Sequence, residues 1–115
     1  MNKEFEELIN TIANNLGQIQ LKFNEYQYNH FPQRSPEFFC LELNGEAGEL
    51  ANLEKKQWKG RDVNPLDYQY ESADVFIALM NYVNSRNIDL KSAVIDKLGK
   101  IEEIRLERKA ELKEY

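Results

Sequence analysis

The chain has 115 residues, of which 42% are hydrophobic and 30% are charged, a composition that suits one domain with one packed core. The longest purely apolar run, Val75 to Met80, is much shorter than the roughly 20 residues that a membrane span requires. The first residues are acidic and do not resemble a secretion signal. We therefore expect a cytoplasmic protein that makes no use of a membrane.

Charge and the rare residue types exclude several classes of function. Fifteen basic residues against twenty acidic ones give a net charge of −5, which disfavours binding to nucleic acid. Cys40 is the only cysteine and His30 the only histidine, which excludes an internal disulfide, a cysteine-rich zinc site and the His-Glu-x-x-His metalloproteases. An acidic chain that handles anions must therefore do so through local lysines or bridging cations.

The first predicted helix covers about residues 3–28. Apolar residues recur every three or four positions from Phe5 to Tyr26, which is a heptad pattern typical of a core or subunit interface. Gly17 is the weakest position for a helix within this stretch.

Three further helices are expected to begin at the N-cap residues Ser35, Asn64 and Asp89. The first two are followed by proline at the first helical position, as Ser35-Pro36 and Asn64-Pro65, and the third by Leu90. The first two of these helices are expected to end near Lys59 and Arg86, because Gly60 and Asn87 accept the left-handed conformation that closes a helix. The last runs from Leu90 into the tail. No stretch alternates with a period of two, so the sequence predicts an all-α fold of four helices.

Acidic side chains recur on the second and third helices. Glu42, Glu46 and Glu49 lie within about 60° of one another at roughly 100° per residue, beside the apolar face of the second helix. Glu71 and Asp74 lie one turn apart and precede the apolar run 75–80, which predicts a third helix buried on most sides. The two helices can therefore bring four carboxylates together.

Four neighbouring carboxylates repel one another and attract a divalent cation. Ligands that are all oxygen favour Mg²⁺, with Mn²⁺ as the alternative, because zinc prefers histidine or cysteine. A chain with twenty acidic residues produces Glu-x-x-Glu by chance, so the prediction depends on the combination of both pairs. Such metals neutralise phosphate oxygens and activate water.

The run Gly45-Glu46-Ala47-Gly48-Glu49-Leu50, followed after a spacer by Glu71-Ser72-Ala73-Asp74-Val75, resembles the MazG-type all-α nucleoside triphosphate pyrophosphohydrolases. The resemblance covers about residues 36–105. It implies a single MazG-like domain over residues 1–115, with a four-helix fold that assembles into a homo-oligomeric helical bundle. Gly45 stands where many members have a further glutamate, and Lys100 stands where others have arginine.

The resemblance also implies a reaction, in which a nucleoside triphosphate is cleaved to the monophosphate and pyrophosphate for nucleotide-pool house-cleaning. Glu46, Glu49, Glu71 and Asp74 would hold Mg²⁺ on the triphosphate, and Glu46 or Glu49 would act as the catalytic residue that orients or deprotonates water. The positions that would contact the sugar or the phosphates of the substrate are Asn81, Lys97 and Lys100.

Two aromatic residues are candidates for contact with a nucleobase. Trp58 lies beside four basic residues at the end of the second helix, Lys55, Lys56, Lys59 and Arg61, and Tyr82 follows Asn81. Each aromatic residue can equally be a half-buried packing residue, and the basic residues can serve only to offset the negative end of the helix dipole.

Two other classes of function stay open at this point, a non-catalytic regulatory module that binds a nucleotide and a metal, and a purely structural helical oligomer. The heptad face of the first helix and the apolar third helix both need cover, and a single chain of this length can hardly supply it for both. We therefore expect a homo-oligomer, either a dimer or a dimer of dimers.

Overall fold

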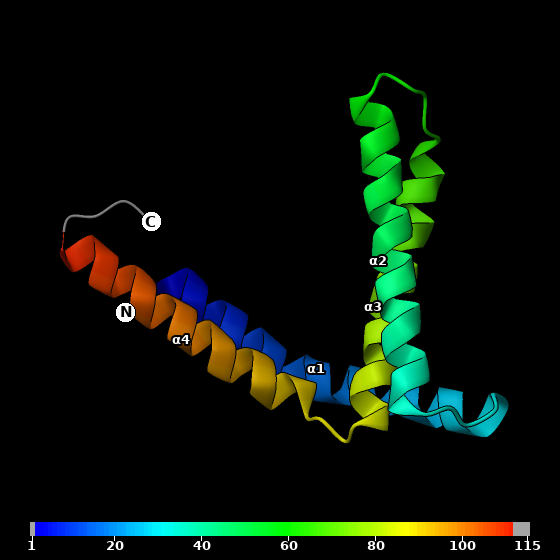
Figure 1. Ribbon diagram of the computed structural model, residues 1–115. Coiled ribbons are helices and arrows are strands. Elements are labelled where there is room, and N and C mark those ends of the chain that lie inside the picture. The colour runs from blue at the N-terminus through cyan, green and yellow to red at the C-terminus, as the bar shows by residue number, and fades with distance from the viewer. Residues whose placement is uncertain (1, 112–115) are drawn as a thin grey trace. The chain divides into compact units, whose positions relative to one another are not determined.

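The structure, a computed structural model, describes residues 2–111 and contains four α-helices (Figure 1). These are α1 (Lys3–His30), α2 (Pro36–Trp58), α3 (Pro65–Ser85) and α4 (Leu90–Ala110). Residues 2–111 contain no β-strand, so the predicted all-α class is confirmed. The part of the expected fourth helix beyond residue 111 lies outside the described residues.

The described residues form two compact units. One unit contains residues 22–88, and the other combines residues 2–21 with residues 89–111. Helix α1 contributes residues to both units. Both acidic motifs lie in the unit of residues 22–88, which therefore contains the predicted metal site.

The predicted N-caps begin α2, α3 and α4. The Ser35 hydroxyl accepts a hydrogen bond from the Phe38 amide at 3.3 Å, and Asn64 accepts one from the Leu66 amide at 3.0 Å. Asp89 caps α4 in the same way through the Ser92 amide. Because each cap satisfies an amide that lacks a partner within its helix, the local sequence fixes where these helices begin.

Helices α2 and α3 end in the closing motif that the sequence predicts. Gly60 has a φ of +86°, and its amide donates to the Gln57 carbonyl at 2.9 Å, while the Arg61 amide donates to the Lys56 carbonyl at 3.0 Å. Asn87, with a φ of +57°, closes α3 with the same pair of hydrogen bonds. This is the Schellman motif, in which a left-handed residue reverses the chain and satisfies the last carbonyls.

In the unit of residues 22–88, α2 and α3 pack side by side and run antiparallel (Figure 1). The side chains that are 5% exposed or less are Phe39, Ala78, Met80 and Val83. The Tyr68 hydroxyl on α3 also donates to the Leu53 carbonyl on α2 at 3.2 Å. This pairing positions the acidic side chains of the two helices.

Much apolar surface of the single chain is left uncovered. Phe76 is 44% and Ile77 is 42% exposed, so α3 is not buried on most sides within one chain, contrary to the expectation from its sequence. The heptad face of α1 is also incompletely covered, since Ile19 is 42% and Tyr26 is 60% exposed. The apolar pattern of α3 exceeds what α2 alone can cover.

In the second unit, the start of α4 is bonded to α1. The Gln20 side chain is buried, and its carbonyl oxygen accepts a hydrogen bond from the Leu90 amide at 3.0 Å. This bond satisfies one of the free amides at the beginning of α4.

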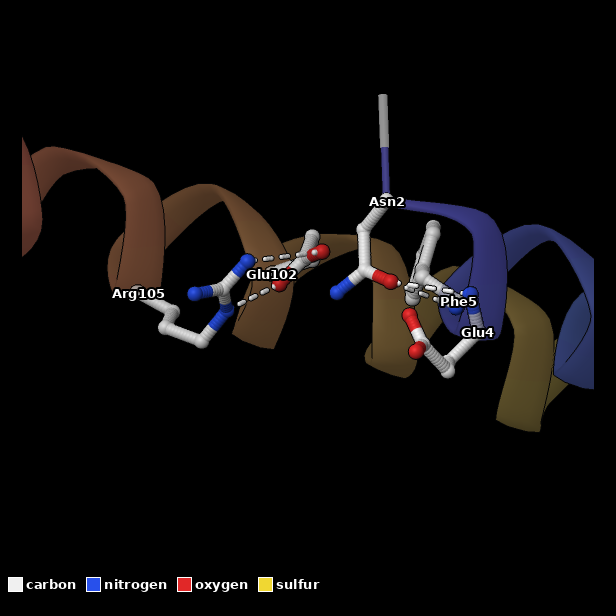
Figure 2. A network of polar contacts seen from close by, with 5 residues as sticks. All are labelled: Asn2, Glu4, Phe5, Glu102 and Arg105. Atoms are coloured by element: carbon white, nitrogen blue, oxygen red, sulfur yellow. Dashed lines mark hydrogen bonds and ion pairs between the residues drawn. The ribbon is translucent and has the colours of Figure 1, made fainter.

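Figure 2 shows the polar contacts at the first residues of α1. The Asn2 side chain accepts hydrogen bonds from the amides of Glu4 and Phe5, at 2.9 Å and 3.2 Å, and so caps α1. On α4, Arg105 forms a double ion-paired contact with Glu102. The hydrogen bond from Arg105 lowers the pKa of Glu102, and a hydrogen bond from Asn2 lowers it further. Arg105 is therefore paired with Glu102 of the same unit.

Among residues 2–111, no helix combines the length and the apolar character that crossing a bilayer requires.

Shortening Met80 should destabilise the fold strongly. Met80 is 1% exposed, so Met80→Ala leaves a cavity in the core and should lower the free energy of unfolding by about 2–5 kcal/mol. Leu106→Ala, at a position that is 49% exposed, should cost less than about 1 kcal/mol. Urea denaturation monitored by circular dichroism measures both values, and equal losses would show that Met80 is not a core residue.

Candidate metal centre

Three glutamates meet where α2 and α3 face each other. Glu46 and Glu49 lie one turn apart on α2, and Glu71 lies on α3. Each offers a carboxylate oxygen, and these oxygens all lie within 4.8 Å of one another. The i, i+3 spacing on one helix and the antiparallel packing of the other therefore bring these three carboxylates together, whereas the sequence predicted a group of four.

The site is graded from half-buried to exposed. Glu46 and Glu71 are half-buried, and the Oε2 atom of each is buried without a hydrogen-bond donor other than a neighbouring carboxyl group among the described residues. Glu49 is exposed and forms the open side of the cluster. Burying a carboxylate oxygen without a donor or cation is unfavourable, so these two oxygens need a proton or a cation.

The protonation of the cluster reflects this arrangement. Burial raises the pKa of Glu71 to about 7, and hydrogen bonds to Glu46 and Glu49 and their negative charges act in the same direction. The hydrogen bond from Glu71 lowers the pKa of Glu46, but burial and the charges of Asp74 and Glu49 outweigh it, so that pKa is raised. At neutral pH, Glu71 therefore still binds a proton in part of the molecules.

The fourth predicted ligand, Asp74, is exposed and does not belong to the group of three. Asp74 nevertheless lies close enough to Glu46 for its charge to raise the pKa of that carboxyl group. Glu42, which lies on the same stripe of α2, is also outside the group and lines a separate cavity. The structure therefore brings together three of the four predicted metal ligands and leaves Asp74 beside them.

Asn81 lines two cavities, neither of which is lined by Glu46, Glu49 or Glu71. It is half-buried and lies about two turns beyond Asp74 on α3. One cavity, of about 230 Å³, is lined by polar side chains that include Asn24, Gln27 and Asn84. The other, of about 420 Å³, is lined largely by apolar side chains that include Phe23, Phe38 and Ile77.

The end of α1 contributes Asn24 and Gln27 to the polar cavity, and nothing in the sequence marks either residue as a candidate for the site. Both lie in the predicted first helix, but helical periodicity alone cannot show which other helix they will meet. Tyr82 is half-buried and lines neither cavity.

The remaining candidates lie away from the glutamates or in the other unit. Trp58 is 88% exposed, so it is not a packing residue of the single chain. Lys97 and Lys100 belong to α4, in the other unit, and the structure does not place them relative to the carboxylates. Lys97 is exposed, and the Lys100 ammonium lies 3.5 Å from a carboxylate oxygen of Asp96.

The chemistry of the donor set suits a hard divalent cation. All ligand atoms are carboxylate oxygens, and two of them are buried with only other carboxyl groups as partners. Glu46, Glu49 and Glu71 could hold Mg²⁺ or Mn²⁺, which bind oxygen ligands and keep part of their water shell. A cation there would replace the retained proton as the balancing charge.

No protein-family model matches the chain, and the comparisons with curated proteins and with solved structures give no match either.

The raised pKa of Glu71 predicts a pH-dependent stability of the metal-free protein. In the folded chain, Glu71 keeps its proton up to about pH 7. In the unfolded chain, where a glutamate has the ordinary pKa of 4.5, the same group releases its proton at lower pH. Because the folded state binds more protons in this range, its stability should fall as the pH rises from about 4.5 to 7. Glu71→Gln should reduce this fall, as measured by urea midpoints at pH 5 and pH 8 in EDTA.

The control is Glu103→Gln, at an exposed glutamate on α4, which should leave the pH dependence unchanged. If Glu71→Gln and Glu103→Gln gave the same profile as the unchanged chain, the cluster would not retain a proton.

Proposed function

We propose that the chain is a Mg²⁺-dependent nucleoside triphosphate pyrophosphohydrolase of the MazG-like type. The observation that carries this proposal is the convergence of Glu46, Glu49 and Glu71, in which two buried carboxylate oxygens have no partner other than a neighbouring carboxyl group. They are three of the four metal ligands that the resemblance of the two acidic motifs implies, the fourth being Asp74. The substrate is a ribo- or deoxyribonucleoside triphosphate, and the products are the monophosphate and pyrophosphate.

Bound Mg²⁺, or Mn²⁺ in its place, supplies charge neutralisation of phosphate oxygens and a more acidic water. Glu49, at the exposed side of the cluster, or Glu46 orients the attacking water and accepts its proton. The water oxygen bonds to the α-phosphorus while the bond from that phosphorus to the bridging oxygen breaks, and pyrophosphate leaves. Glu71 and Asp74 complete the negative charge that holds the metal.

The cavities next to Asn81 are suited to the nucleoside part of the substrate. Asn81 donates to the sugar or a phosphate in this proposal, and the apolar walls of the larger cavity suit a nucleobase. Lys97 and Lys100 pair with phosphates, and Trp58 and Tyr82 remain the aromatic candidates for stacking on a base. A role in removing unwanted nucleotides from the cytoplasmic pool is part of the same proposal.

Pyrophosphate release measured over a panel of triphosphates with Mg²⁺ tests the proposal directly. Turnover of at least one nucleotide supports it. A chain that binds Mg²⁺ and nucleotide in calorimetry without turnover would instead be the regulatory module, and a chain that binds neither would be the structural oligomer.

Loss of a carboxylate from the cluster should abolish hydrolysis. Glu49→Ala and Asp74→Ala should each reduce kcat/KM more than about 100-fold. This is more than the effect of removing a residue that only hydrogen-bonds to a metal ligand, which costs about 10- to 100-fold. Both positions are exposed, so the variants should fold, and removing one of several like charges should not lower their stability. Glu42→Ala is the matched control with a smaller expected effect, and full activity of Glu49→Ala would remove the assigned site.

We further propose that the active form is a homo-oligomer of this chain. The apolar side chains left open on α3, Phe76 and Ile77, and on α2, Leu41, are 42–73% exposed in the single chain. Exposed apolar residues in such numbers on a small α-helical unit are characteristic of a surface that a partner covers. A second copy of the same chain is the partner that the resemblance to the MazG-type enzymes implies, and two-fold pairing closes the assembly.

Light scattering during gel filtration at micromolar concentration should therefore give a dimer or a dimer of dimers. The expected masses are twice or four times the 13.6 kDa of one chain, because pairing removes apolar surface from water. Ile77→Glu should shift the species toward the monomer, whereas Leu106→Glu on α4 is the comparison variant. A stable and active 13.6 kDa species would contradict the proposal.

A further inference from the structure

A second polar pocket lies at the C-terminal end of α2. Its volume is about 280 Å³, and its lining residues are Asn52, Lys55, Lys56, Lys59 and Arg61. Four of the 15 basic residues of the chain are thus concentrated in seven successive positions, although the net charge of the chain is −5. No acidic residue lines this pocket.

The local fold explains why these cations share one pocket. Asn52, Lys55, Lys56 and Lys59 fall within about 100° of one another around the axis of α2. Arg61 would lie beyond the helix, but the left-handed Gly60 reverses the chain there, and the Arg61 amide bonds back to the Lys56 carbonyl at 3.0 Å. The Schellman motif thus places a fifth polar side chain beside the four on the helix.

The positive charges of this pocket have no anionic partner within the described residues. None of the four basic side chains has a carboxylate oxygen within 4.0 Å, the distance of an ion pair, among residues 2–111. Glu54, which precedes Lys55, acts instead on Tyr68 of α3, whose pKa is raised by burial and by the Glu54 charge.

The helix end compensates for only part of this charge. The negative end of the helix dipole corresponds to about half an elementary charge, against four formal positive charges. Like charges around one pocket repel one another, so a multivalent anion would stabilise this arrangement most.

We propose that the pocket formed by Asn52, Lys55, Lys56, Lys59 and Arg61 binds a compact polyphosphate, either inorganic pyrophosphate or the triphosphate tail of a nucleotide. Lysine ammonium groups and an arginine guanidinium are the common donors to phosphate oxygens, and Asn52 adds an amide donor. A pocket one helical turn or two in length matches a short phosphate chain better than an extended nucleic-acid strand. The site is separate from the carboxylate cluster and needs no metal.

The test uses the full chain in EDTA, where the metal-dependent hydrolysis proposed above does not take place. Trp58 is the only tryptophan, is 88% exposed and lies within the basic segment, so its fluorescence reports binding. Titration with pyrophosphate, and separately with a nucleoside triphosphate, should give saturable binding that weakens as salt is added. Calorimetry should give one site per chain.

A charge-matched pair of variants locates the site. Lys56→Gln with Lys59→Gln should weaken pyrophosphate binding about tenfold or more, because two charged hydrogen bonds are lost. Lys3→Gln with Lys109→Gln removes the same charge elsewhere and should change the affinity less than about twofold. All four side chains are exposed, so both variants should fold, which circular dichroism checks.

The two probes distinguish the two sources of phosphate. Similar affinities assign the site to inorganic pyrophosphate, and tighter binding of the nucleotide assigns it to a nucleotide tail. Absence of saturable binding, or an equal loss in both double variants, would overturn the proposal. Binding to a single-stranded oligonucleotide that exceeds pyrophosphate binding and grows with strand length would also overturn it, in favour of a nucleic-acid surface.

Discussion

The antiparallel packing of α2 against α3 is the constraint on which the rest of the candidate site depends. It brings the Glu46 and Glu71 carboxylates together at a half-buried position that lacks any basic side chain in the described contacts. A carboxylate there can lower its free energy by keeping a proton or by binding a cation, and the pKa of about 7 for Glu71 reflects the first of these. In the proposed metal complex, a cation would take the place of this proton.

Helix α2 separates charges of opposite sign along its length and around its axis. Its middle carries Glu46 and Glu49 near the contact with α3, and its end carries four cations around a separate pocket. About two turns of helix separate Glu49 from Lys56. The cations lie at the end where the helix dipole favours positive charge. Glu46 and Glu49 lie about a Debye length or more from these cations, so they do not neutralise the positive charge of the pocket. The net charge of −5 therefore describes neither site.

The sequence predicts the helix ends well because the determinants are local. Ser35 and Asn64 cap the next turn, and Gly60 and Asn87 adopt positive φ for stereochemical reasons that need no distant residue. The meeting of Glu46 and Glu49 with Glu71 is also predictable, since helical spacing and a short connection favour the packing of α2 against α3. What the sequence could not provide is tertiary. It gave no indication that Asn24 of α1 reaches the cavity beside Asn81, or that Asp74 stays outside the group of three glutamates.

The apolar surface of α3 and the carboxylate site are linked physically. The apolar sequence of α3 calls for cover on most sides, but within residues 22–88 its main neighbour is α2, with Phe23 of α1 against Phe76, and Phe76 and Ile77 remain 44% and 42% exposed. Ile77 lies one turn from Asp74 and lines the cavity that Asn81 also lines. A second copy covering this face would remove water beside the carboxylates, which would strengthen both their mutual repulsion and their attraction for a cation. In the proposed oligomer, assembly and metal binding would therefore favour each other. The cation would offset the carboxylate repulsion that assembly increases, and assembly would strengthen the attraction of the carboxylates for the cation.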